Sequence, residues 1–249
     1  MKKSMLRQLV NLLALIITIV VNGLANALPI NGVTTAEVSD SFPVYFVPAG
    51  YVFAIWGVIY LALLSLAIYQ LLPAQRENRR LERIGGWFAV GCLANAAWIF
   101  FWHYRIFPVT LILMLVLLAS LLAIYLRLGI GRSEVSRVEK WLVDVPFSIY
   151  LGWITVATVA NVTDVLYYLG WNGAPLSPQT WAAIMLVIAA ALAVAMALMR
   201  RDIAYVLVIV WAFVGIAIKQ AATPVVAWSA WVLAAVALVT LGFGVLRKT

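Results

Sequence analysis

The chain has 249 residues, of which 66% are hydrophobic and only 10% are charged. Soluble domains are nearer half apolar and a quarter charged, so this composition excludes an ordinary water-soluble domain. The formal net charge of +8 would indicate a nucleic-acid partner in a soluble protein. Here the basic residues lie in short segments between long apolar runs, which argues against nucleic acid.

Eight apolar runs of about 20 residues follow one another, each long enough to cross a bilayer as a helix. A bilayer core offers the backbone no hydrogen-bond partners, so helices are the natural way to span it. The sequence therefore predicts an all-α integral membrane protein with about eight transmembrane helices. They are expected at residues 6–28, 49–72, 84–101, 108–126, 141–168, 181–199, 203–218 and 225–245.

The loop charges predict an orientation. With the N-terminus inside, 15 of the 17 Lys and Arg residues lie on the inner side, and only Arg105 and Lys219 lie outside. The positive-inside rule then predicts an even number of spans with both termini in the cytoplasm. The basic inner loops and short ends favour a bacterial inner membrane, and the lipid bilayer is the first expected partner.

The first apolar run has two interpretations. Its basic start, its apolar stretch and the Ala25-Asn26-Ala27 sequence also fit a cleavable signal peptide, which would leave seven spans. The length of the run and the polar residue Asn22 favour a retained helix that packs against others.

The predicted outer loop at residues 29–47 contains no Lys or Arg and carries Glu37 and Asp40. It is either a lid that folds over the bundle or a passive connector at the interface.

Polar and aromatic side chains recur at one depth of the predicted bundle. Asn95, Trp98 and Trp102 are spaced by three and four residues and share one helix face. Trp153 and Asn161 share a face of the fifth span. That face also carries Asp164 and is flanked by Tyr150 and Thr158. Two such faces pointing inward would line a pocket for a large flat hydrophobe with a few polar groups.

These residues also have an interpretation without a ligand. Asn, Ser and Thr often join membrane helices, and Trp gathers at both membrane interfaces. Six tryptophans are predicted to lie in the anchoring belts at the membrane interfaces: Trp87, Trp102, Trp141, Trp171, Trp181 and Trp228. The deeper residues Trp56, Trp98 and Trp153 are predicted to belong to the pocket.

No catalytic residue and no metal ligand is predicted. His103 and Cys92 are each the only residue of their type, and one His without nearby Cys, Asp or Glu does not make a metal site. Asp164 and Lys219 are expected to form a structural ion pair near the outer surface. The small residues Gly85 and Ala89 (with Ala96) allow close helix contact, which leaves a homodimer open.

Three motifs resemble the translocator-protein family, also called the tryptophan-rich sensory proteins (TspO). The second span opens with PAGYVF at 48–53 followed by Trp56 and Tyr60, where the family has Pro-Pro-Gly-Trp-Val-Phe. The third span has NAAW at 95–98, and the fifth has YLGWITVATVAN at 150–161. This chain differs in having Tyr51 for the family's Trp, in placing Trp56 one residue early, and in having three further helices.

The resemblance implies a five-helix bundle over residues 1–170, with a ligand pocket closed by the loop between its first two helices, and three additional helices over 171–249. Family members bind porphyrins, sterol-like lipids and aromatic drugs. The expected function is a sensor or carrier for a tetrapyrrole- or sterol-like ligand, with a transporter or a porphyrin-degrading enzyme as alternatives. No cofactor is required, and a porphyrin or haem-like molecule is the expected ligand. The expected ligand-binding residues are Tyr51, Phe53, Trp56, Asn95, Trp98, Tyr150, Trp153 and Asn161.

Overall fold

Eight long apolar helices account for most of the chain in the computed structural model, which describes residues 3–171 and 173–247. The predicted all-α membrane fold is confirmed. The helices are α1 (Lys3–Ala27), α3 (Ile55–Leu71), α5 (Trp87–His103), α6 (Phe107–Leu128), α8 (Val145–Tyr168), α9 (Pro178–Arg200), α10 (Ile203–Lys219) and α11 (Pro224–Leu246). Six helical segments are long and apolar enough to cross a membrane, and α5 and α10 are shorter apolar helices. Their 17 residues are at the lower end of the range that spans a bilayer.

Short helical turns connect these helices. They are η1 (Ile30–Gly32), α2 (Thr35–Asp40), η2 (Gly50–Ala54), η3 (Pro73–Gln75), α4 (Arg79–Glu82), α7 (Arg137–Glu139) and the π-helical turn η4 (Lys140–Asp144).

Local sequence signals explain several helix ends. Ser177 accepts a hydrogen bond from the Thr180 amide at 3.1 Å, and Pro178 follows as the first residue of α9. Asp202 caps α10 in the same way through the Tyr205 amide at 3.1 Å. These side chains satisfy amide groups that have no partner within the helix.

The chain folds as two compact units. The first contains residues 3–35 and Ile55–Leu151, and the second contains residues 36–54 and 152–247. The backbone of α8 passes from the first unit to the second between Leu151 and Gly152. The predicted domain boundary at residue 170 was drawn from the family resemblance, and it stays a prediction.

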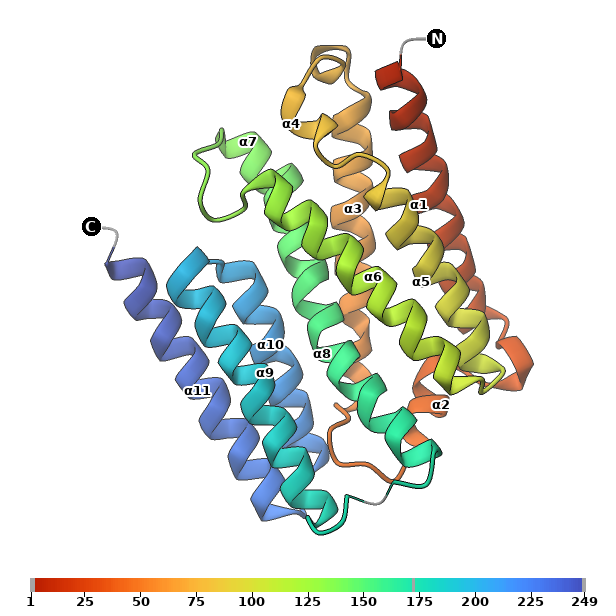
Figure 1. Ribbon diagram of the computed structural model, residues 1–249, viewed down its shortest axis with the longest axis vertical. Coiled ribbons are helices and arrows are strands. Elements are labelled where there is room, and N and C mark those ends of the chain that lie inside the picture. The colour runs from red at the N-terminus through yellow and green to blue at the C-terminus, as the bar shows by residue number, and fades with distance from the viewer. Residues whose placement is uncertain (1–2, 172, 248–249) are drawn as a thin grey trace. The chain divides into compact units, whose positions relative to one another are not determined.

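In the first unit, α5 packs against both α1 and α6, and α1 also packs against α3 (Figure 1). Gly91 of α5 allows a close approach, because a Cβ atom there would lie 3.4 Å from Leu117 and from Ser120 of α6. Polar side chains join α1 to its neighbours: Thr18 donates to the Cys92 carbonyl at 2.9 Å, and Asn11 donates to Gln70 at 3.4 Å. These bonds show that α1 packs as one of the helices of this unit.

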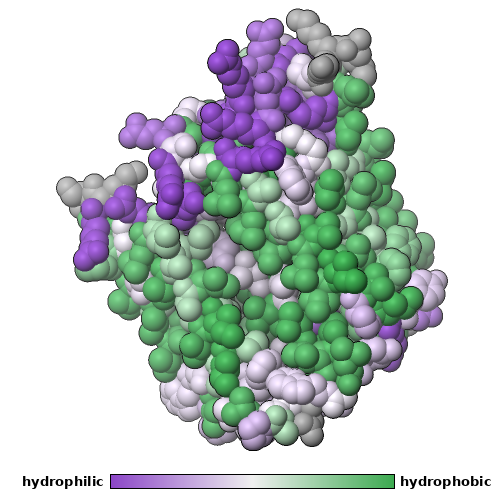
Figure 2. Space-filling view, viewed as in Figure 1, coloured by the Kyte–Doolittle hydropathy of each residue, from purple (hydrophilic) through white to green (hydrophobic). Residues whose placement is uncertain are grey.

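One end of the first unit is hydrophilic. Figure 2 shows hydrophilic residues gathered over the end that carries α4 and α7, while the sides of the helices are mostly hydrophobic. Asn78 donates to Glu139 at 2.9 Å there, and Arg80 forms an ion pair with Asp144. The end corresponds to the predicted inner side of the membrane. Asp144 is therefore held by an arginine at this end of the unit.

In the second unit, α9, α10 and α11 pack against one another (Figure 1). Their contact faces are rich in small residues, of which Ala193, Ala197, Ala212 and Ala237 are fully buried. Small residues let membrane helices approach closely. Large apolar residues such as Val239 face outward, as expected for helices surrounded by lipid.

Residues 36–54, which include the second half of the predicted outer loop and the turn before α3, are attached to α10 within the second unit. The Ala49 amide donates to the Gly215 carbonyl at 3.2 Å, and the Trp211 indole donates to the Val52 carbonyl at 3.1 Å. Lys219, the last residue of α10, forms an ion pair with Asp40. The segment is therefore held at several points along its length, and its role as a lid stays a prediction.

Candidate functional site

The eight predicted ligand-binding residues fall in both units. The first unit contains Trp56, Asn95, Trp98 and Tyr150. The second unit contains Tyr51, Phe53, Trp153 and Asn161. Each group is described within its own unit.

A chain of hydrogen bonds links three helices of the first unit. The Asn22 side chain of α1 donates to the side-chain oxygen Oδ1 of Asn95 at 2.8 Å, and the side-chain nitrogen Nδ2 of Asn95 donates to the Tyr150 hydroxyl at 2.9 Å. All three side chains are buried. Among the described residues, the Tyr150 hydroxyl has no acceptor for its own proton.

Trp56 lies between two phenol rings in the same unit. Its indole stacks on Tyr60 with ring centres 5.5 Å apart and meets the edge of Tyr150 at 6.1 Å. The Tyr60 hydroxyl is buried and has no hydrogen-bond partner in the described part of the chain. The first unit therefore brings together an indole face and two buried phenol hydroxyls, and the Tyr60 hydroxyl has no hydrogen-bond partner among the described residues.

Trp98 and Trp102 form a separate stack on α5, with ring centres 4.8 Å apart. Trp102 was predicted to lie in the interfacial belt. It is buried instead, and its indole donates to the Thr35 carbonyl at 3.2 Å. It therefore packs inside the first unit rather than facing lipid.

In the second unit, Phe53 meets the edge of buried Trp153 with ring centres 5.8 Å apart. Tyr51 is 46% exposed and lies edge-on to Trp211 at 5.4 Å. Asn161 is buried in α8. Both aromatic pairs join the segment that precedes α3 to other helices of this unit.

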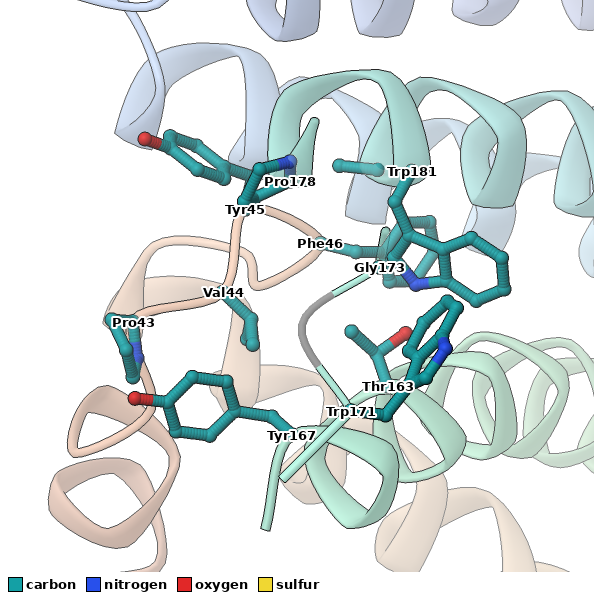
Figure 3. A pocket seen from close by; sticks show the side chains of 11 residues that line it. Pro43, Val44, Tyr45, Phe46, Thr163, Tyr167, Trp171, Gly173, Pro178 and Trp181 are labelled. Carbon is teal, nitrogen blue, oxygen red and sulfur yellow. The ribbon is translucent and has the colours of Figure 1, made fainter. Parts of the chain in front are cut away.

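A partly open cavity of about 120 Å³ lies in the second unit (Figure 3). Its walls come from the predicted outer loop, the end of α8 and the start of α9. The lining residues are Pro43, Val44, Tyr45, Phe46, Thr163, Tyr167, Trp171, Gly173, Pro178, Trp181 and Ala182. None of the eight predicted ligand-binding residues lines this cavity.

The expected ion pair between Asp164 and Lys219 is wrong, because Lys219 pairs with Asp40. Asp164 is only 2% exposed, and its Oδ1 atom has no hydrogen-bond partner among the described residues. Asp40 and Asp164 both lie in the second unit, and Asp40 is the one that pairs with Lys219.

His103 is fully buried, and its Nδ1 atom lies 2.7 Å from the Ile99 carbonyl of its own helix. Within residues 3–171 and 173–247, no group of three or more His, Cys, Asp or Glu side chains is placed to hold a metal ion.

Comparison with known proteins identifies a family. A family model described as "TSPO-like protein" matches residues 8–243. The match extends through α9 and α10 into α11, so it includes the region beyond the five helices of the predicted bundle. No curated protein and no solved structure matches the chain.

Proposed function

The chain belongs to the TSPO-like protein family, and from this premise we propose that it is a membrane binding protein for a large hydrophobic ligand of the tetrapyrrole or sterol class. It would act as a sensor or carrier. Apolar burial and aromatic stacking would supply most of the affinity. Polar side chains of the first unit would orient the ligand.

The observation that carries the proposal is the arrangement of Tyr60 and Tyr150 around Trp56. A buried hydroxyl without an acceptor costs roughly 1–3 kcal/mol, and the surrounding bilayer offers no water to relieve that cost. A ligand with acceptor atoms at its edge, such as the carboxylates of a porphyrin or the oxygen of a sterol, would satisfy these donors. The Trp56 indole offers a flat apolar face beside them.

The test uses Tyr60→Phe, because this change removes only a hydroxyl that has no partner in the described part of the chain. Purified protein is titrated with protoporphyrin IX, and binding is followed by the porphyrin absorption band. We expect the variant to bind about fivefold more weakly, which corresponds to one hydrogen bond. The ligand-free variant should be equally stable or slightly more stable, because an unsatisfied buried group is gone.

Tyr104→Phe is the matched control, because Tyr104 is exposed at the end of α5. It should bind the porphyrin like the wild type. Non-saturable binding, or equal affinity in the wild type and Tyr60→Phe, would contradict the proposal.

We also propose that the protein lies in a bacterial inner membrane with both termini on the cytoplasmic side, because the predicted inner loops are basic. An alkaline phosphatase reporter, active only outside the cytoplasm, should be inactive when fused after Arg247. It should be active when inserted in the turn at Gly173, between α8 and α9. The opposite pattern of activity would reverse the orientation.

A further inference from the structure

We propose that the second unit contains a separate site for a small, uncharged aromatic molecule. The site is the cavity of about 120 Å³ between the predicted outer loop, α8 and α9. An apolar cavity of about 150 Å³ is known to hold benzene, whereas pockets for drug-sized ligands span roughly 300–1,000 Å³. The cavity is therefore large enough to enclose a single ring and too small to enclose a tetrapyrrole, so this inference does not depend on the proposed function.

The walls of the cavity suit an aromatic ring. Figure 3 shows Trp171 and Trp181 on one side of the pocket and Pro43 with Tyr167 on the other. The two indoles meet edge to face with centres 4.5 Å apart, and Phe42 supports Tyr167 from outside the lining with centres 6.2 Å apart. Aromatic rings prefer such edge-to-face and offset arrangements, so a further ring can join the cluster in the same geometry.

The lining also determines the polarity of the ligand. No lining residue is charged, so an ion would lose its hydration without a counter-charge. Thr163 already donates to the Val159 carbonyl at 3.1 Å, and the Tyr45 hydroxyl already accepts from Gln179 at 3.0 Å. The Trp181 nitrogen has no hydrogen-bond partner within the described residues, but it is buried and presents no surface to the cavity. The lining therefore favours an uncharged ring held by apolar and aromatic contacts.

The loop side of the cavity is already fixed. The Gln179–Tyr45 hydrogen bond and the Lys219–Asp40 ion pair tie the loop to the ends of α9 and α10. A wall that is ordered before binding loses little conformational entropy when the ligand enters. The site therefore needs no large rearrangement to accept a small molecule.

Two probes of similar shape test the inference. 4-Fluoroacetophenone is uncharged, and 4-fluorobenzoate has nearly the same shape but carries a negative charge. Binding of each to the full chain in lipid nanodiscs is measured by fluorine NMR, with empty nanodiscs as the partition control. We expect the ketone to bind the wild type saturably and the carboxylate about tenfold more weakly or not at all, because the cavity offers no counter-charge.

Val44→Phe, which fills the cavity from the loop, should remove binding of the ketone. Trp228→Phe on the lipid-facing side of α11 is the control and should leave that binding unchanged. Equal affinities of the two probes in the wild type would overturn the inference. Binding that survives Val44→Phe would do so as well. Tyr60→Phe should leave both affinities unchanged, so failure here is distinguishable from failure of the tetrapyrrole proposal.

Discussion

Replacing Asp144 with leucine should lower the free energy of unfolding by about 3–5 kcal/mol, because it leaves a buried arginine without its counter-charge. The side chains of Arg80 and Asp144 are only 13% and 10% exposed. Arg80 also donates to the Leu128 carbonyl at 3.3 Å, but its Nε and Nη1 atoms have no hydrogen-bond partner among the described residues. Unfolding in mixed micelles with increasing denaturing detergent measures the loss.

Two further variants separate the ion pair from general disruption. Arg80→Met combined with Asp144→Leu should recover most of the stability, because no buried charge then remains. Lys219→Met should cost no more than about 1 kcal/mol, because the side chains of Lys219 and Asp40 are 28% and 54% exposed and solvent screens that pair. If Asp144→Leu alone lowered the free energy of unfolding only slightly, the Arg80 side chain would have to reach water in the absence of its partner.

Gly215→Val should lower the free energy of unfolding by about 3 kcal/mol, near the upper end for overpacking. A Cβ atom at this position of α10 would collide with the Val52 side chain and would lie 3.3 Å from the Cβ atom of Pro48. Val52 is fully buried and stiff, so it has little room to move. The added side chain should push residues 48–52 away from the helix and break the bond from the Ala49 amide to the Gly215 carbonyl.

Hydrogen exchange checks this mechanism. The backbone amides of residues 48–54 should exchange faster in Gly215→Val, while those of α5 should be unchanged. Gly242→Val is the matched control, because a Cβ atom at Gly242 of α11 would meet nothing within 4 Å. If exchange and stability were unchanged in Gly215→Val, the attachment of the loop to α10 would be incorrect.

The helices were predictable because each needs a long apolar run, and apolar runs are visible in the sequence. The predicted helix starts were less accurate where a backbone turn or a capping residue determines the first residue of the helix. The third span was expected from residue 84, but Gly85 adopts a positive φ of 59° and α5 begins only at Trp87. The sixth span was expected from residue 181, although Ser177 and Pro178 form a recognisable helix start.

The contacts between segments were not predictable, because the sequence indicates the depth of a side chain and not its neighbours. Asp40 and Asp164 both lie near the predicted outer surface, and only the folded loop decides which of them reaches Lys219. Trp171 and Trp181 were predicted as interfacial anchors, and they line the small cavity. Interfacial anchors and pocket walls use the same residue types at the same depth, so hydropathy cannot separate them.

The attachment of residues 36–54 also has a consequence for how the protein is made. Its partners lie far along the chain: Gln179 is 134 residues from Tyr45, and Lys219 is 179 residues from Asp40. A ribosome adds about 5–20 residues per second, so Asp40 waits roughly 10–35 s for Lys219 to be synthesised. During that interval the aromatic loop has left the ribosome without the surface that later covers it. Residues 36–54 can therefore reach their final contacts only after α10 has been synthesised, and this segment of the nascent chain stays uncovered until late in synthesis.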